Sequence, residues 1–377
     1  MCKYLILVAV YLIPLRTIEA PQLGVSDLLD KYAANQDKLK SFIVKSEDTL
    51  LRTYRHAPYQ RLERWHCDFR TDGERIHFRA NLWIDLASEE DEVPTSADAD
   101  EEMHLLWDGK RYIYYRTFKA TGRKVAFINT DEERNRYRVP NEMCKAFDGG
   151  ARLLGIIYGD GKRVDLILRQ ADSISIRDEM EKVGSVTCYV VDARTKHGSY
   201  TLWFDPEHGY NIAKAYKQMG PNDLFFGRPF KGNTRYSSIS FSMENVRFKQ
   251  MGSIWIPVEA DSLTTFNYPE GGAIVMKWRQ KRTQFILNPD HEVLGSFVPM
   301  VEDGTRVYMN KEGVRYEWQN GKPLASIDEA VTDQPDQMAD KSTPYLVPFL
   351  MLIIFLVIVA IGWQVFPRIK RDIRGRL

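Results

Sequence analysis

The chain has 377 residues, of which 44% are hydrophobic and 27% charged, a composition typical of a folded globular protein rather than a disordered one. This length suits one large domain or two of ordinary size. Because 52 basic side chains are balanced by 51 acidic ones, no overall field would attract nucleic acid, and we expect no nucleic-acid partner.

Residues 1–20 have the pattern of a secretory signal peptide. Lys3 precedes an apolar run over residues 4–15, and Ala20 stands at a plausible cleavage position. Pro21 is a poor residue directly after a cleavage site, so an uncleaved signal anchor remains an alternative. Either interpretation predicts that the following residues, 21–295, form an exported domain.

The first element expected in that domain is a helix over residues 24–42. Ser26 can cap its N-terminus, and Asp27 and Asp30 suit the positive end of the helix dipole. The helix has an apolar stripe made of Leu28, Leu29, Tyr32 and Ala33.

The pattern then changes to period two, most clearly in residues 74–86. Trp83 lies on one face of this expected strand, opposite the apolar face of Ile76, Phe78, Ala80, Leu82, Ile84 and Leu86. Asp72-Gly73 predicts a two-residue hairpin turn to a partner strand over residues 61–70. A second Asp-Gly pair, at 108–109, predicts the next hairpin.

The acidic run over residues 88–102 separates these hairpins, and we expect it to be a solvated loop. A calcium site is the alternative, although the glycine and spacing of an EF-hand loop are absent. Helical patterns return over residues 141–159 and 175–183. The remaining pattern predicts strands over residues 186–194, 199–205, 210–219, 235–249, 253–266 and 272–287.

Consecutive strands joined by short turns favour antiparallel pairing, so we expect an α+β fold built on a large curved sheet with a few helices. Residues 296–324 are expected to add a small hairpin, which leads into a polar stalk over residues 325–344. Residues 345–366 are uncharged and long enough to cross a membrane, and the tail, 367–377, is basic. The positive-inside rule then predicts a single-pass membrane protein with a periplasmic or otherwise extracytoplasmic domain and a cytoplasmic tail.

A cluster of acid and base in one stretch, Asp205, Glu207 and His208, could suggest a catalytic or metal site. However, Asp-Pro opens turns and Gly209 supplies the positive φ of a tight turn, so we expect a hairpin corner. In the strand before it, Tyr200, Leu202 and Phe204 should share one face.

Cysteine chemistry is not favoured either. His66 and Cys67 are adjacent in a strand, and adjacent strand residues point to opposite faces, which argues against a thiol mechanism. Cys67, Cys144 and Cys188 allow either one disulfide with one free thiol or three free thiols.

Tryptophans lie in several strand-like runs, at positions 83, 107, 203, 255 and 278. Helices packed over the second face of the sheet would explain them. A curved sheet whose concave side is lined with large side chains, suited to an apolar ligand, is the second interpretation.

Four segments together resemble the periplasmic lipoprotein-carrier superfamily of LolA-, LolB- and RseB-like proteins. They are "LLDKYAANQDKLKSF" before a strand, "WDGKRYIYY", "YTLWFDPEHGY" and "FKQMGSIWIPVEA". The last is similar to the G-x-W-x-P strand of the carriers, and the resemblance spans residues 25–290. The region after it is similar to an extension of exported bacterial proteins of this type, notably from planctomycete-like genomes. This resemblance implies a half-open antiparallel barrel with a helical lid that holds acyl chains, and no catalytic residue.

We therefore expect a membrane-anchored, non-catalytic binding module for lipid or lipoprotein acyl chains, with no cofactor and no metal. The expected cavity face comprises Ile76, Phe78, Leu82, Ile84, Leu202, Phe204, Ile254 and Ile256. The alternative is an envelope sensor, similar to RseB, which acts through a separate inner-membrane protein partner.

Overall fold

The computed structural model describes residues 23–55, 60–87, 99–129, 155–230, 235–309 and 316–325. All of these lie in the first of two compact units, Met1–Ser326. The second unit, Ile327–Leu377, lies outside the described residues, and so do the expected signal peptide, the membrane span and the basic tail.

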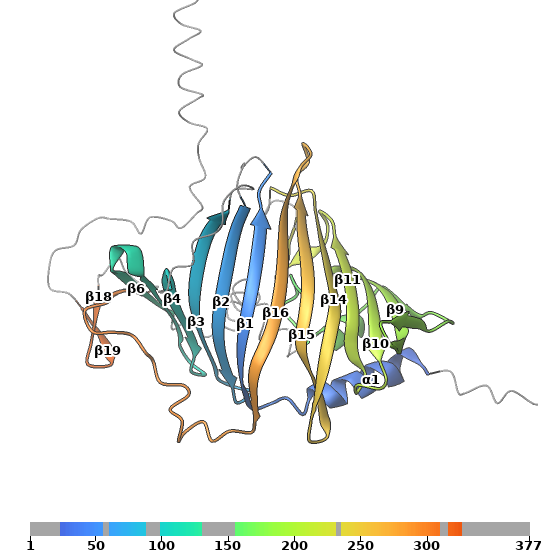
Figure 1. Cartoon of the computed structure of the whole chain (residues 1–377), viewed down its shortest axis with the longest axis horizontal. Coiled ribbons are helices and arrows are strands. Elements are labelled where there is room, and N and C mark those ends of the chain that lie inside the picture. Colours follow the sequence, from blue (N-terminus) through green and yellow to red (C-terminus); the bar gives the residue numbers. More distant parts are fainter. Residues whose placement is uncertain are drawn as a thin grey trace, which may run out of the picture. The chain divides into compact units, whose positions relative to one another are not determined.

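One sheet of seventeen strands dominates the described residues (Figure 1). Its strands are β1 (Phe42–Thr53), β2 (Gln60–Thr71), β3 (Ile76–Ala87), β4 (Glu101–Trp107), β5 (Tyr112–Phe118), β6 (Arg123–Asn129), β7 (Ser173–Ile176), β8 (Glu181–Val183), β9 (Val186–Thr195), β10 (Gly198–Asp205), β11 (Asn211–Met219), β14 (Ser238–Met251), β15 (Ile254–Asn267), β16 (Ala273–Leu287), β17 (Arg306–Met309), β18 (Tyr316–Gln319) and β19 (Lys322–Ala325). The predicted curved sheet is confirmed.

In space, β1 is central, because it pairs with both β2 and β16. On one side of β1 the strand order is β2, β3, β4, β5, β6, β17, β18 and β19. On the other side the order is β16, β15, β14, β11, β10 and β9. Strand β9 also pairs with β7 and β8. The pairings are antiparallel with one exception, β6 with β17, which is parallel. The predicted antiparallel pairing holds for the described ladders apart from this one, because β17 arrives from a long connection rather than a tight turn.

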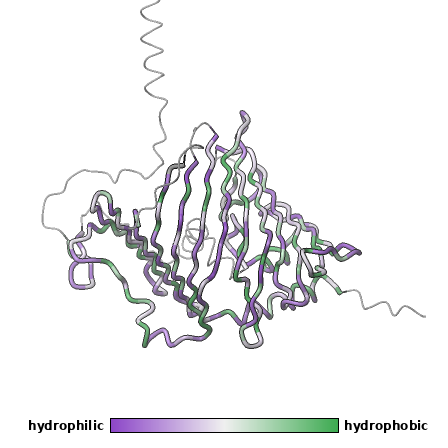
Figure 2. Tube along the Cα trace, in the orientation of Figure 1, coloured by the Kyte–Doolittle hydropathy of each residue, from purple (hydrophilic) through white to green (hydrophobic). Residues whose placement is uncertain are grey.

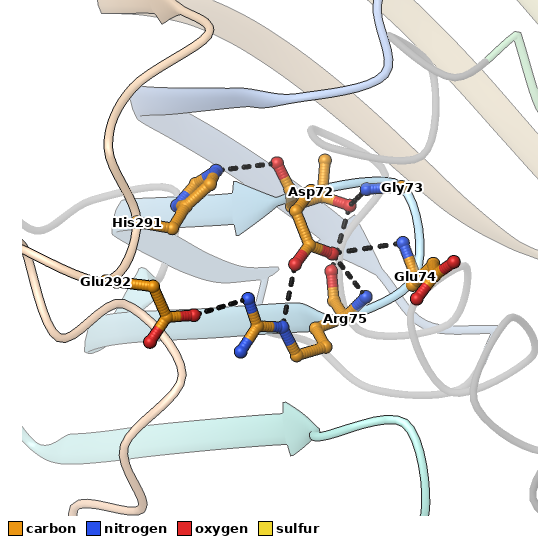
Figure 3. A network of polar contacts seen from close by, with 7 residues as sticks. Asp72, Gly73, Glu74, Arg75, His291 and Glu292 are labelled. Carbon is orange, nitrogen blue, oxygen red and sulfur yellow. Dashed lines mark hydrogen bonds and ion pairs between the residues drawn. The ribbon is translucent and has the colours of Figure 1, made fainter.

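The two Asp-Gly hairpins form, but with four-residue turns rather than the two-residue turns predicted, since Thr71 pairs with Ile76 and Trp107 with Tyr112. In the first turn, Asp72 Oδ1 accepts hydrogen bonds from the backbone N–H groups of Glu74 (3.0 Å) and Arg75 (2.6 Å) (Figure 3). Gly73 adopts the positive φ, 94°, that the turn requires. The turn over residues 108–111 repeats this arrangement.

The strands alternate between hydrophilic and hydrophobic residues, as Figure 2 shows along their traces. We call the face that carries Phe42, Leu50 and Phe69 the inner face, because its side chains join the largest hydrophobic cluster. The outer face of β1 and β2 carries exposed polar residues such as Lys45, Glu47 and His66.

The helices differ most from the prediction. The first, α1 (Val25–Gln36), begins after an N-cap at Gly24 instead of Ser26 and ends before residue 42. The helix expected over residues 175–183 is wrong: these residues contribute to β7 and β8, because pairing with β9 outweighs a weak helical pattern. A short helix that was not predicted, α4 (Val164–Leu168), is present, and the expected helix over 141–159 lies mostly outside the described residues.

A C-terminal segment, which we define as residues 288–309 and 316–325, packs on the outer face of β3 to β6. It adds Phe297, Val301, Val307 and Trp318 to a second hydrophobic cluster with Leu106, Ile113, Tyr115, Ala126 and Ile128. The expected hairpin of residues 296–324 is present as the pairing of β17 with β18, and it belongs to the same sheet.

Polar contacts fix the start of this segment. His77 Nδ1 lies 2.6 Å from the carbonyl oxygen of Ser296, and His291 Nε2 lies 2.9 Å from that of Thr71. Figure 3 shows Arg75 between Asp72 and Glu292, its guanidinium donating to both.

Among the described residues, no helix has the length and apolar character needed to span a membrane. The predicted span, residues 345–366, lies outside them.

Candidate functional site: the covered inner face

The eight residues predicted to line a cavity belong to one hydrophobic core. They come from β3, β10 and β15, and this core is the inner-face cluster. Five are buried, namely Phe78, Leu82, Leu202, Phe204 and Ile256, while Ile76, Ile84 and Ile254 are partly buried against the same core. Whether any of them contacts a ligand stays a prediction.

A separate layer of chain covers the inner face over β9 to β16. We define this cover as α1, residues 155–168 with α4, and the small hairpin of β12 (Leu224–Phe225) and β13 (Arg228–Pro229). Leu28, Leu29 and Tyr32 of α1 are buried, and Tyr32 packs edge-to-face on Phe204 with ring centroids 5.5 Å apart. Figure 1 shows α1 near the ends of β10 and β11.

Aromatic rings bind the rest of the cover to the sheet. The ring of Tyr158 is within 6.3 Å, centroid to centroid, of rings from both layers: Phe225, Phe226, Phe241 and Phe266. Gly155 has a positive φ of 69°, and a Cβ there would lie 2.1 Å from Tyr32 Oη, so only glycine allows this close approach of the two cover segments.

A small void lies between the cover and the sheet. It has a volume of about 40 Å³, enough for a few water molecules at roughly 10–15 Å³ each. Its wall is mostly apolar and comes from both layers: Tyr32, Gln36, Gly155, Ile156, Ile157, Asn211, Ile212, Phe241, Met243, Val246, Phe248, Pro257, Ala260 and Arg282. None of the eight predicted residues is part of it, although Ile212, Phe241 and Ala260 lie on the same strands or on strands paired with them.

Three polar residues border this void. Gln36 Nε2 donates to Asn211 Oδ1 (3.0 Å), which joins α1 to the start of β11. Arg282 donates to the carbonyl oxygen of Pro257 (3.1 Å). These side chains give an otherwise apolar void a polar side.

A fully buried ionic cluster ties the cover to the sheet. Lys217 of β11 donates to Asp160 and, at 3.1 Å, to the carbonyl oxygen of Tyr158. Tyr200 donates to the same carboxylate at 2.7 Å. Burial raises the pKa of Asp160, against the opposing effect of Lys217. A cluster of this kind is satisfied only while the cover is in place.

Polar residues also occupy inner-face positions in the middle of the sheet, at Ser46 and Asp48 of β1, beside Gln280 and Arg282 of β16, and all four are buried. Further along the same face, Arg52 and Arg61 both approach Glu63. The sequence reasoning missed these residues. Ser46 and Asp48 stand between Val44 and Leu50 at alternate positions of the strand, where the pattern would otherwise place apolar residues. This departure from the alternation could have revealed them.

The cluster at residues 205–209 is a turn, as predicted. Asp205 Oδ1 accepts from the backbone N–H of Glu207 (2.9 Å) and of His208 (3.2 Å), while Oδ2 lies 2.5 Å from His208 Nδ1. Gly209 has a φ of 70°. The His208 ring stacks on Phe248 of β14, centroids 5.1 Å apart, so the histidine joins the turn to the neighbouring hairpin.

Tyr200, Leu202 and Phe204 share the inner face, as predicted, and are all buried. The tryptophans divide between faces. Trp278 belongs to the inner cluster, while Trp203 joins a small outer cluster with Cys188 and Val190.

His66 and Cys67 point to opposite faces, as predicted. The His66 ring packs on Trp83, whereas the Cys67 sulfur lies 4.0 Å from Asp48 Oδ2. Burial and the Asp48 carboxylate raise the pKa of Cys67, which opposes formation of a nucleophilic thiolate. Cys67 and Cys188 are both free thiols, and Cys144 lies outside the described residues.

Within the described ranges, no group of three or more His, Cys, Asp or Glu side chains is placed to hold a metal ion. Residues 88–98 of the acidic run lie outside the described residues. Residues 101 and 102, which were expected to belong to the loop, instead begin β4.

No protein-family model matches the chain, and no curated protein matches it. Among solved structures, it is similar to a DUF1329 family protein from Desulfovibrio piger, with 10% identity over 71% of this chain and 94% of that chain, at a TM-score of 0.37. It is also similar to MucB in complex with MucA(peri), with 9% identity over 68% and 92% of the two chains, at a TM-score of 0.20. At these identities and TM-scores the comparisons indicate no more than a distant relationship. They assign no function to this chain.

Proposed function

We propose that the chain is a non-catalytic binding module that takes an apolar ligand, a lipid or lipoprotein acyl chain, between its sheet and its cover. The observation that carries this proposal is the void at the boundary of the two layers. Its wall is mostly apolar and is shared between them, which is the usual lining of a pocket for an apolar molecule.

The void is too small for the proposed ligand. A volume of about 40 Å³ cannot hold an acyl chain, so this is a closed state, and binding requires the cover to move. Apart from α1, the cover consists of short elements, such as the five-residue α4 and the two-residue strands β12 and β13, which suits it to movement.

Photo-crosslinking tests the proposal with the full chain in a nonionic detergent. The probe is palmitic acid carrying a diazirine, and labelled peptides are mapped by mass spectrometry. We expect labels in α1, in residues 155–157 and around Ala260 of β15. Ala260→Phe should fill the void and remove these labels. Leu263→Phe is the matched control, since Leu263 lies on the same strand but is 38% exposed on the outer face.

Labels confined to the outer face or to residues 345–366 would overturn the proposal, and so would labelling of the void that Ala260→Phe leaves unchanged. Either result would favour the alternative function, an envelope sensor that acts through a protein partner.

A further inference from the structure

Two arginines and one glutamate form a compact trio on the inner face of β1 and β2. Arg52 and Arg61 are direct partners in the antiparallel ladder, and Glu63 follows Arg61 by two residues, so all three point to the same side. Arg61 Nε lies 2.8 Å from Glu63 Oε1, and Arg52 Nη2 lies 3.5 Å from the same oxygen.

The trio has more positive charge than its glutamate can balance. Like charges directly opposite each other in a ladder are destabilising, and a single carboxylate neutralises only one of the two guanidiniums. Glu63 Oε2 already accepts a hydrogen bond from Trp65 Nε1 at 3.2 Å. The buried Arg52 Nε has no hydrogen-bond partner among the described residues. Among the described residues of the trio, the two guanidiniums therefore carry one positive charge more than Glu63 balances.

A second trio of the same composition on the outer face shows what is unusual here. Arg247 and Arg279 both pair with Glu259, but their side chains are 70% and 69% exposed, so water solvates their excess charge. The side chains of Arg52 and Arg61 are only 30% and 31% exposed, and Glu63 is 2% exposed. Reduced solvation strengthens the attraction of the inner trio for an anion.

Apolar side chains lie directly beside the inner trio. Arg52 is opposite Met276, and Leu50, the inner-face residue before it, is opposite Trp278. Trp65 and Trp278 have ring centroids 6.5 Å apart. The charged pair thus stands beside an apolar patch of Leu50, Trp65, Met276 and Trp278, which ends at the polar positions Asp48 and Gln280.

The same end of the sheet carries two more arginines. The Arg55 guanidinium lies 5.0 Å from the Tyr268 ring centroid, and that of Arg235 lies 5.5 Å from it. Arg55 also pairs with Glu270. Arg55 and Arg235 thus lie just beyond the ends of β1 and β14, at the end of the sheet that carries Arg52 and Arg61.

We propose that Arg52 and Arg61 form a headgroup subsite, and that the ligand is an amphiphile with an anionic head, a phosphate or a carboxylate. The guanidinium fork matches both anions in geometry. The apolar tail follows the inner face away from the subsite. This inference rests on the proposed function and names the ligand class of the same face.

Native mass spectrometry of the full chain in a nonionic detergent tests the inference. The probes are dodecyl phosphate and monododecanoyl glycerol, which have equal tails and differ in the charge of the head. We expect dodecyl phosphate to bind at least tenfold more tightly. The variant Arg52→Gln/Glu63→Gln/Arg61→Gln keeps hydrogen-bonding groups without charge and should bind both probes equally.

Two further variants control this result. Arg247→Gln/Glu259→Gln/Arg279→Gln makes the same change in the outer trio and should keep the tenfold preference. Arg52→Lys/Arg61→Lys keeps the positive charge and should keep most of the preference. Binding of monododecanoyl glycerol by the glutamine variant, unchanged from wild type, shows that its loss of preference is not a loss of folding.

The outcomes separate the two proposals. Equal binding of both probes, or a preference that survives the inner glutamine variant, would overturn the headgroup subsite while the binding module stands. Displacement of dodecyl phosphate by equimolar inorganic phosphate would also overturn it, since the tail would then contribute nothing. Binding of neither probe would contradict the proposed function itself.

Discussion

Two separate segments pack on the sheet, the cover on its inner face and the C-terminal segment on its outer face, and different chemistry holds each. The cover is joined to β10 and β11 by the buried cluster of Asp160, Lys217 and Tyr200. The C-terminal segment is held by the cluster around Trp318 and by a neutral histidine contact, His77 to Ser296. At the inner boundary the two layers share a mostly apolar void.

The difference teaches which layer can respond to a ligand. The C-terminal segment is held both by a hydrophobic cluster and by the ladder of β17 with β6. It resists separation from the sheet because buried apolar area and backbone hydrogen bonds would be lost together. The cover has no ladder pairing of this kind with the large sheet among the described residues, and its contacts include side-chain packing and the buried ion pair. We infer that the inner layer moves and that the outer layer acts as a support.

The largest expected effect is at this buried ion pair. Lys217→Met leaves the buried Asp160 without its cation, so we expect a loss of about 3–5 kcal/mol in the free energy of unfolding, measured by denaturant titration. Lys217→Met/Asp160→Leu removes both charges and should recover most of the lost free energy of unfolding. A double variant no more stable than the single one would show that the ion pair does not hold the cover.

The outer contact should respond to pH. Burial lowers the pKa of His77 to about 4, with smaller effects of His104, Arg70 and Arg79. The folded-state pKa lies below the unfolded value of about 6.5. The stabilising contribution of neutral His77 is therefore present above pH 6.5 and is lost as the pH falls toward 4. The total loss in the free energy of unfolding from this group is about 3 kcal/mol.

This pH dependence can be separated from that of the carboxylates by a variant. His77→Gln keeps a donor for the Ser296 carbonyl but does not titrate. The difference in unfolding free energy between wild type and variant should therefore narrow or reverse between pH 6.5 and 4. A constant difference across this range would contradict the role of His77.

The smallest effect is expected at the exposed ion pair of Arg75 and Glu292, whose glutamate is 79% exposed. Glu292→Gln should change the free energy of unfolding by less than about 1 kcal/mol, because surface pairs are screened by water and salt. A larger change would mean that this contact holds the C-terminal segment more strongly than its exposure indicates.

The sequence predicted the sheet well because period-two alternation directly reflects a strand with one buried face. Ile76, Phe78 and Leu82 of β3 were assigned to the inner face on this basis. The turn at Asp205 was also recognisable, since Asp-Pro and Gly209 have local conformational requirements.

The sequence predicted α1, but the tertiary contacts of the cover and the pairing of β7 and β8 could not be predicted in the same way. Residues 173–183 became strands through pairing with β9, which is a tertiary effect. The contact of Lys217 with Asp160 joins residues 57 positions apart, and neither residue is unusual locally. The void likewise depends on distant segments, from Tyr32 to Arg282.

The most direct test of the central claim is hydrogen–deuterium exchange of the full chain in a nonionic detergent, with and without palmitic acid. We expect the ligand to change exchange in α1, in residues 155–168 and in the inner strands β11, β14 and β15, while the C-terminal segment keeps its protection. Unchanged exchange in the cover, or a change confined to the C-terminal segment, would contradict ligand binding between the cover and the sheet.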